Sequence, residues 1–415
     1  MNYIEQLGAN AKAAEKAIAT ASSVLKNKAL TGIADALVKN TDRIIEQNKL
    51  DLDNAVKNNM SEAMQDRLML NPARINDIAK GVLELVELED VIGSVDSGTI
   101  RPNGLRILKT RVPLGVIGII FESRPNVTVD AAALCIKSGN AVILRGGKEA
   151  INSNKCLTEV MRAAVAEAGL PSDIVQLVAD TSRESASELM RLNKYLDVLI
   201  PRGGAGLINA VMQQATVPVI ETGTGNCHVY VDSSADLDMA AAIVDNSKTQ
   251  RPSVCNAIEN LLVHKDVAEA FLPKMKKVLD GHNVKLLGCD KCRKILGECV
   301  STATEEDYAK EFLDYIIAVK VVDSLDEAIE HISKYSTKHS ECIVTNDLVS
   351  AERFQHEIDA AAVYVNASTR FTDGNMFGLG AEIGISTQKL HARGPMGLKE
   401  LTTIKYLING NGQIR

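Results

Sequence analysis

From about residue 112 onward the chain alternates between short apolar runs and segments with the spacing of helices. One helical segment, Cys156–Ala168, is followed by Gly169 and Pro171, two residue types that end helices. Strands that are apolar along their whole length are covered on both faces, as in a parallel sheet flanked by helices. The pattern therefore predicts an α/β domain with strands at Val116–Phe121, Ala141–Leu144, Ile174–Val178, Val198–Ile200 and Val217–Ile220.

Later apolar runs predict a second α/β domain, and its strands are expected at Leu261–Val263, Ile316–Val322, Cys342–Thr345 and Ala362–Asn366. A chain of 415 residues is long enough for two or three domains with separate cores. The first ninety residues are expected to be helical, because apolar residues recur there with helical spacing, for example Leu30, Ile33, Ala34, Leu37 and Val38.

Two segments belong to neither series. Thr99–Thr110 contains Pro102-Asn103-Gly104 between two short extended stretches, which predicts a β-hairpin. Thr402–Ile408 has the pattern of a lone strand near the C-terminus. Because an isolated hairpin is only marginally stable in water, we expect these strands to pair with each other or with another subunit.

The charge balance and the apolar pattern exclude several classes of function. A net charge of −7 argues against broad binding to nucleic acid or anionic membranes, which requires a clustered positive surface. No run of 18 apolar residues is present, and the first residues lack the basic start and apolar core of a secretory signal. Eight irregularly spaced cysteines suit a reducing compartment. We expect a cytoplasmic enzyme.

The standard nucleotide-binding motifs are missing. The sequence has no G-x-x-x-x-G-K-[ST], which argues against a P-loop kinase or ATPase. Gly378-Leu379-Gly380 with Gly384 approaches G-x-G-x-x-G in spelling but lies far from the first predicted sheet, and we interpret it as a loop. Cys289-x-x-Cys292 lacks the paired spacing of a structural zinc site, and we predict no metal. A dinucleotide would bind here without the usual fingerprint.

Cys255 lies in a short irregular connection between a predicted helix at Asp236–Lys248 and a strand that begins at Ile258. A nucleophilic cysteine must be a thiolate, which requires nearby positive charge or oriented N–H groups. Arg251 is a candidate for that charge. The alternative is that Cys255 is a small buried apolar residue of the core.

Glu221 follows the predicted strand Val217–Ile220 directly. Ligands of open α/β sheets collect at the carboxyl ends of the strands, and an acid after an apolar strand needs a partner. The alternative is that Glu221 is a loop carboxylate that caps a backbone turn.

Taken together, Glu221 in E-x-G-x-G-N and a loop cysteine 34 positions later (255 − 221) resemble the aldehyde dehydrogenase superfamily. The resemblance is greatest to the branch that reduces L-glutamyl 5-phosphate. It covers nearly the whole chain, in the segments 112–150, 221–232, 250–257, 318–329 and 363–403. The implied fold is α/β and aldehyde dehydrogenase-like, with two parallel-sheet domains and a small β flap for oligomerisation.

The resemblance implies a catalytic set of three residues. Cys255 is similar in position to the thiol nucleophile, which would form a thioester with the acyl group and release phosphate. Asn126 is the candidate side-chain donor to the oxyanion, and Arg124 could bind the leaving phosphate. Glu221 matches the residue that activates water in the oxidising relatives. In a reductase we expect it instead to assist deprotonation of Cys255 or to position the cofactor.

The resemblance also implies NADP(H) as the cofactor. The adenosine site is expected at Arg145-Gly146-Gly147-Lys148, where Lys148 occupies the place of an acid in NAD-preferring relatives and would favour a 2′-phosphate. The alternative is that Arg145 and Lys148 are simply two basic residues on a solvated turn. Arg202-Gly203-Gly204 resembles the loop that approaches the pyrophosphate, and Glu311 matches the acid that holds the nicotinamide ribose.

For the glutamyl group, the candidates are Arg370, His391 and Arg393, together with Arg124. The implied reaction yields L-glutamate 5-semialdehyde and phosphate, in the second step of proline biosynthesis. The labile substrate also suggests, as a hypothesis, contact with glutamate 5-kinase, the kinase that makes it. The other readings are a hydrolytic semialdehyde dehydrogenase and a catalytically silent nucleotide-binding or scaffolding protein.

The domain organisation follows the same resemblance. Residues 1–98 and 113–225 are expected to form the NADP(H)-binding domain, and residues 226–393 the catalytic domain. Residues 99–112 and 394–415 are expected to form the hairpin and C-terminal strand through which a homo-oligomer assembles.

Overall fold

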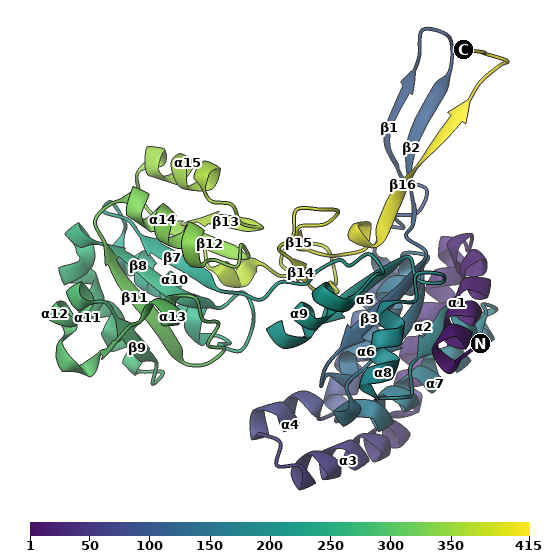
Figure 1. Cartoon of the computed structure of the whole chain (residues 1–415), viewed down its shortest axis with the longest axis horizontal. Coiled ribbons are helices and arrows are strands. Elements are labelled where there is room, and N and C mark those ends of the chain that lie inside the picture. Colours follow the sequence, from purple (N-terminus) through teal and green to yellow (C-terminus); the bar gives the residue numbers. More distant parts are fainter. The chain divides into compact units, whose positions relative to one another are not determined.

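The computed structural model describes all 415 residues, except for the side chain of Ala63. The chain folds into two compact units (Figure 1). The first unit comprises residues 1–222, 378–384 and 396–415, and the second comprises residues 223–377 and 385–395. Each unit is an α/β structure around a parallel sheet, as the sequence predicts.

Five helices open the first unit: α1 (Tyr3–Ala19), α2 (Ser23–Lys39), α3 (Thr41–Lys57), α4 (Glu62–Leu68) and α5 (Pro72–Glu87). The predicted apolar stripe of α2 is buried at Leu30, Ile33, Ala34 and Leu37. Val38, the last residue of that stripe, is 49% exposed. Val38 lies at the edge of the stripe in the last turn of the helix, where no neighbour covers it.

The sheet of the first unit has four parallel strands in the order β5-β4-β3-β6. These strands are β3 (Val116–Phe121), β4 (Ala141–Arg145), β5 (Val175–Leu177) and β6 (Val198–Arg202). The helices between and after them are α6 (Pro125–Lys137), η1 (Lys148–Ala150), α7 (Ile151–Ala168), η2 (Ser172–Ile174), α8 (Arg183–Met190) and α9 (Ala205–Gln214). Every residue of β3 is buried, which explains its continuous apolar run.

The strand predicted at residues 217–220 is not formed. A single parallel bridge joins Val219 to Leu199 in β6. Pro218 has no N–H to donate and contributes only its carbonyl oxygen, which accepts from the N–H of Leu199 at 2.8 Å. Glu221 therefore follows an irregular extended segment rather than a strand.

The predicted hairpin and C-terminal strand are confirmed as one antiparallel sheet in the order β1-β2-β16. Its strands are β1 (Val95–Ile100), β2 (Arg106–Pro113) and β16 (Thr402–Asn409). Gly104 has a φ of +89° at the hairpin turn, a conformation that suits glycine. Figure 1 shows this sheet projecting from the helical part of its unit.

The second unit contains a seven-stranded sheet in the order β10-β9-β11-β8-β7-β12-β13, and every paired strand in it is parallel. The strands are β7 (Cys227–Val231), β8 (Ile258–His264), β9 (Lys285–Gly288), β10 (Ser301–Thr302), β11 (Ile316–Val322), β12 (Ser340–Val344) and β13 (Ala362–Val365). The two-residue strands β14 (Ile385–Ser386) and β15 (Gly394–Pro395) pair separately.

Helices cover both faces of the seven-stranded sheet. One apolar core joins the sheet to α10 (Leu237–Thr249), α11 (Lys265–Asp280) and α12 (Asp290–Leu296). The other core joins it to α14 (Leu325–Tyr335) and α15 (Leu348–Glu357). The remaining short helices are η3 (Gly297–Cys299), α13 (Glu305–Tyr308), η4 (Thr369–Phe371) and η5 (Lys399–Leu401), of which η5 belongs to the first unit. None of the helices in the described residues has the length and apolar character needed to cross a bilayer.

Candidate active site

Cys255 lies in the connection between α10 and β8, at residues 250–257, which we call the cysteine loop. Its side chain is half-buried, whereas Cys135, Cys156, Cys227, Cys292 and Cys342 are buried. All eight cysteines are free thiols. The position of Cys255 is therefore that of a partly accessible loop residue and not of a core residue.

The backbone of the cysteine loop passes directly against Gly225. A side-chain carbon added to Gly225 would overlap the carbonyl oxygen of Cys255. Gly225 belongs to the segment E-x-G-x-G-N, and its N–H donates to Oε1 of Glu311 at 2.7 Å. Gly225 thus connects the cysteine loop to Glu311, the acid that the family resemblance matches to the nicotinamide ribose. Burial raises the pKa of Glu311.

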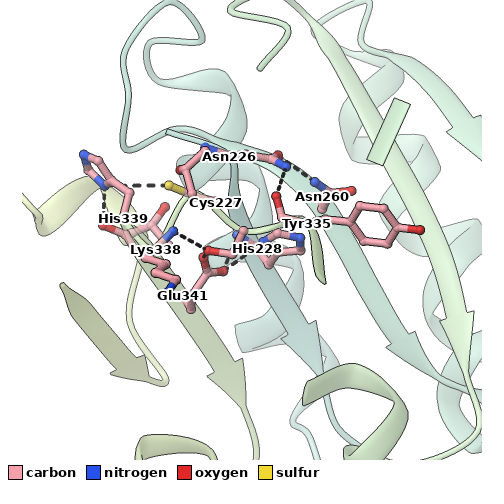
Figure 2. A network of polar contacts seen from close by, with 12 residues as sticks. Asn226, Cys227, His228, Asn260, Tyr335, Lys338, His339 and Glu341 are labelled. Carbon is pink, nitrogen blue, oxygen red and sulfur yellow. Dashed lines mark hydrogen bonds and ion pairs between the residues drawn. The ribbon is translucent and has the colours of Figure 1, made fainter. Parts of the chain in front are cut away.

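A buried polar network fixes the residues that follow Gly225 (Figure 2). The side-chain amide of Asn226 donates to the carbonyls of Tyr308 (2.7 Å) and Tyr335 (2.8 Å). The Cys227 thiol donates to the carbonyl of Cys255 at 3.2 Å. Burial, followed by nearby Glu341, raises the pKa of the Cys227 thiol well above its ordinary value, so it remains a protonated donor. The network therefore anchors the cysteine loop from the side of β7.

Lys248 and Glu259 form an ion pair with fully buried side chains, at 2.6 Å, across the base of the cysteine loop. The second oxygen of Glu259 accepts from the N–H of Leu313 at 3.0 Å, which ties the Glu311 segment to the same pair. Burial raises the pKa of Glu259 to about 7 and lowers that of Lys248, while their mutual attraction opposes both shifts. No sequence pattern indicates this pair, although Lys248 and Glu259 bracket Cys255 in the chain.

Arg370 and Arg393 are predicted to bind the glutamyl group. In the structure both side chains bond to residues of the second unit. Arg370 hydrogen-bonds to Gln250 and Asn256, the residues at the start of the cysteine loop and directly after Cys255. Nη1 of Arg393 pairs with Asp359 at 2.9 Å. His391, also in this unit, is exposed and has a φ of +69°.

In the first unit, Arg124 is the N-cap residue of α6 and Asn126 lies in the first turn of that helix. The amide nitrogen of Asn126 donates to Oδ2 of Asp130 at 2.9 Å, one helical turn further on. Burial raises the pKa of Asp130 to about 6, while the Asn126 bond and the charge of Arg202 oppose the shift. The sequence does not single out Asp130, because its i, i+4 relation to Asn126 has meaning only once the helix α6 is known.

The predicted adenosine turn follows β4. Lys148 is exposed, whereas Nη2 of Arg145 donates to the carbonyls of Thr181 (3.0 Å) and Ser182 (3.1 Å). A side chain on Gly146 would overlap Asn154, and one on Gly147 would overlap the carboxylate of Glu149. The exposed side chain of Lys148 is therefore accessible to a ligand, whereas Arg145 binds the loop at Thr181 and Ser182.

The second predicted cofactor segment lies at the start of α9. Arg202 is the last residue of β6, and Gly204 is the N-cap of the helix. The N–H of Gly204 donates to Oε2 of Glu122 at 2.9 Å, and a side chain on Gly203 would approach the same oxygen to 2.6 Å. The N-terminus of α9 therefore already holds the carboxylate of Glu122, and its two glycines leave the backbone open to close approach.

Glu221, the third predicted catalytic residue, is half-buried and belongs to the first unit, next to Thr222. The hydroxyl of Thr222 donates to the carbonyl of Pro201 at 2.6 Å. The end of the Glu221 segment is therefore fastened to β6.

The family model that matches this chain is that of the aldehyde dehydrogenase family, over residues 3–287. A γ-glutamyl phosphate reductase from Clostridium novyi (strain NT) is 60% identical over 414 residues, which cover 100% of this chain and 99% of the relative. The crystal structure of a γ-glutamyl phosphate reductase from Thermotoga maritima has a TM-score of 0.98 and 49% identity, with 100% of both chains covered.

A more distant structure shares the fold alone. It is an engineered glycolyl-CoA reductase with bound NADP⁺, with a TM-score of 0.71 and 17% identity, covering 97% of this chain and 96% of that chain.

Proposed function

This chain belongs to the aldehyde dehydrogenase family and, within it, to the γ-glutamyl phosphate reductases, and we propose that it works through a thioester on Cys255 with NADPH as reductant. The proposed reaction converts L-glutamyl 5-phosphate to L-glutamate 5-semialdehyde and phosphate, as the second step of proline biosynthesis. The observation that carries the mechanism is the half-buried Cys255 on a loop held against Gly225 and Cys227.

Cys255 begins the reaction as a thiolate. Its sulfur attacks the acyl carbon, the C–O bond to phosphate breaks, and the phosphate leaves with the bonding electrons. A reduced nicotinamide cofactor bound here would supply the hydride that turns the resulting thioester into a thiohemiacetal oxyanion. When the C–S bond then breaks, the aldehyde is released and the sulfur leaves as a thiolate again. Covalent catalysis thus divides one difficult displacement into easier steps.

Each tetrahedral species carries an oxyanion that needs fixed donors. We assign this role to the side-chain amide of Asn126 and the backbone N–H of Cys255. The amide nitrogen of Asn126 has two N–H groups, and only one is needed for Asp130. Arg124, at the start of the same helix, is the proposed partner of the leaving phosphate.

Lys148 is the residue that we expect to bind the 2′-phosphate of NADPH, because its ammonium group is exposed beside the glycine turn. Gly146 and Gly147 allow the backbone of that turn to approach the cofactor closely. Gly203, Gly204 and the N-terminus of α9 fit the pyrophosphate, with Arg202 beside them.

The remaining assignments complete the proposed site. Glu311 is proposed to bind the nicotinamide ribose. Glu221 is proposed to assist deprotonation of Cys255 or to position the cofactor, because activation of water would waste the thioester. His391 and Arg393 are proposed to recognise the glutamyl group.

The deciding experiment is the reverse reaction, in which glutamate 5-semialdehyde reduces NADP⁺. We expect this reaction to require inorganic phosphate and to be lost in Cys255→Ala. Retained activity in Cys255→Ala would exclude the covalent mechanism. An equal rate without phosphate would favour the second candidate, a hydrolytic semialdehyde dehydrogenase, and absence of any turnover would favour a silent nucleotide-binding protein.

We also propose that the enzyme is a cytoplasmic homo-oligomer. The β1-β2-β16 sheet exposes apolar side chains that include Ile100, Tyr406 and Ile408, which an isolated subunit would leave in water. Sedimentation analysis of the whole chain and of Ile408→Asp would test this surface. Contact with glutamate 5-kinase is a further proposal, and identical pathway flux with the two enzymes tethered or separate would count against it.

A further inference from the structure

Arg370 joins the two sides of the cysteine loop with one side chain. Its Nε donates to Oε1 of Gln250 at 2.9 Å, and its Nη1 donates to Oδ1 of Asn256. Gln250 is the first residue of the loop and Asn256 directly follows Cys255. Since a guanidinium group is planar and rigid, these two bonds fix the distance between the residues that they join.

The short helix that carries Arg370, η4, is itself fastened to the cysteine loop. The amide of Asn256 donates to the carbonyl of Thr372 at 2.9 Å and to that of Arg370 at 3.3 Å. The hydroxyl of Thr369 donates back to the carbonyl of Asn256 at 2.7 Å. Asn256, Thr369 and Thr372 are all buried, so these bonds are protected from water. The loop and η4 therefore move as one piece.

The same arrangement brings a positive charge close to the nucleophile. Burial lowers the pKa of Arg370, and the charge of ionised Cys255 opposes that shift more than any other group does. The other charged groups that face Arg370 are Arg251, which is positive, and Asp373, which is negative. The nearby Cys227 thiol stays protonated and adds no charge. A guanidinium remains charged at any pH that the protein tolerates.

We propose that Arg370 is a positioning residue for Cys255, which holds the cysteine loop through Gln250 and Asn256 and favours the thiolate over the thiol. This inference rests on the proposed role of Cys255 as the nucleophile. It gives Arg370 a function that is separate from recognition of the glutamyl group.

The test measures the thiol directly and does not depend on turnover. The full-length protein is alkylated with iodoacetamide over a range of pH, and the rate at Cys255 is followed by peptide mass spectrometry. In Arg370→Met we expect the midpoint of the alkylation profile to rise, so that the rate at pH 7 falls about tenfold for each pKa unit. The limiting rate at high pH should equal that of the wild type, because the thiolate itself remains accessible.

Arg370→Lys keeps the charge and loses the planar pair of bonds, and we expect a smaller rise of the midpoint. Arg353→Met is the matched control, because Arg353 lies on α15 of the same unit and pairs with Asp326 and Glu357. Its profile should equal that of the wild type. If Arg370→Met does not fold, the Arg370→Lys profile decides in its place.

An unchanged midpoint in the Arg370 variant would overturn the inference. Failure of the proposed function would look different, because Cys255→Ala would then retain reverse activity whatever the alkylation profile shows. If the Arg370 variant had a wild-type midpoint and Cys255→Ala were inactive, the proposed role of Arg370 would be overturned. The proposed role of Cys255 would stand.

Discussion

Gly225 and Cys255 lie so close together that the α-carbon of Gly225 faces the carbonyl oxygen of Cys255 with no room for a side chain between them. The contact links the segment before β7 to the loop that carries Cys255, and Glu311 binds the N–H of the same glycine. Any side chain at position 225 must therefore displace Cys255, Glu311 or both.

The first prediction concerns this contact. Gly225→Ala should lower kcat of the reverse reaction by about 100-fold or more, because a displacement near 1 Å at a reacting group has an effect of that size. Gly81→Ala is the control: Gly81 lies within α5 with open space around it, and alanine there should raise stability by about 0.5–1 kcal/mol. A Gly225→Ala enzyme with wild-type kcat would show that the cysteine loop tolerates displacement.

Asn126→Ala should remove one donor to the oxyanion. We expect kcat to fall by about 10²–10³-fold with a much smaller change in KM, since the bond acts on the tetrahedral species. The alkylation rate of Cys255 should remain at its wild-type value. A large rise in KM with unchanged kcat would instead assign Asn126 to ground-state binding of the substrate.

Asp130 predicts a pH dependence of stability. Its pKa is about 6 in the folded protein against an ordinary value of 3.8, so between these values the folded state binds a proton that the unfolded state has released. The stability that Asp130 contributes is therefore present below about pH 3.8 and is lost as the pH rises toward 6. As the pH rises over this range, the melting temperature of the wild type should fall relative to that of Asp130→Asn. Parallel curves would show that Asp130 titrates normally.

Lys148→Glu should reverse the preference for the cofactor. A carboxylate at this position repels a 2′-phosphate and can accept a hydrogen bond from a 2′-hydroxyl. We expect kcat/KM for NADP⁺ to fall by about tenfold or more and that for NAD⁺ to rise, as measured in the reverse reaction. Lys155→Glu, on the neighbouring helix α7, is the control for a general change of charge. An unchanged ratio would place the 2′-phosphate elsewhere.

The buried pair of Lys248 and Glu259 should show strong coupling. Lys248→Met leaves a carboxylate without its partner in the core, which should cost about 3–5 kcal/mol of unfolding free energy. The double variant Lys248→Met/Glu259→Leu should recover much of this loss. Urea unfolding of both variants measures the coupling, and additive losses would mean that the two groups act independently.

Much of the architecture was predictable because it depends on local pattern. Continuous apolar runs identified the parallel strands β3 and β11, and Gly169 marked the end of α7, where it adopts a φ of +101°. The wrong prediction, at residues 217–220, had the same apolar pattern. There Pro218 limits pairing with β6, which apolarity alone does not reveal.

The candidate residues were named by resemblance, and the contacts around them come from the structure. Asp130 is an example, because its bond to Asn126 becomes evident only once the helix α6 is known. Arg370 is a second example: it was named for the substrate, and its bonds to Gln250 and Asn256 span 120 and 114 residues of sequence. No local pattern indicates a bond over such a separation.

The sequence by itself determined the α/β class, the hairpin that pairs with the C-terminal strand, and a cysteine in a loop between a helix and a strand. Only the tertiary structure decided that Cys255 lies against Gly225, that its carbonyl accepts from the Cys227 thiol, and that Arg370 binds the residues on both sides of it. The reason is physical. Strands and helices follow from the order of neighbouring residues, whereas the environment of a thiol depends on which distant segments the packed sheet brings to it.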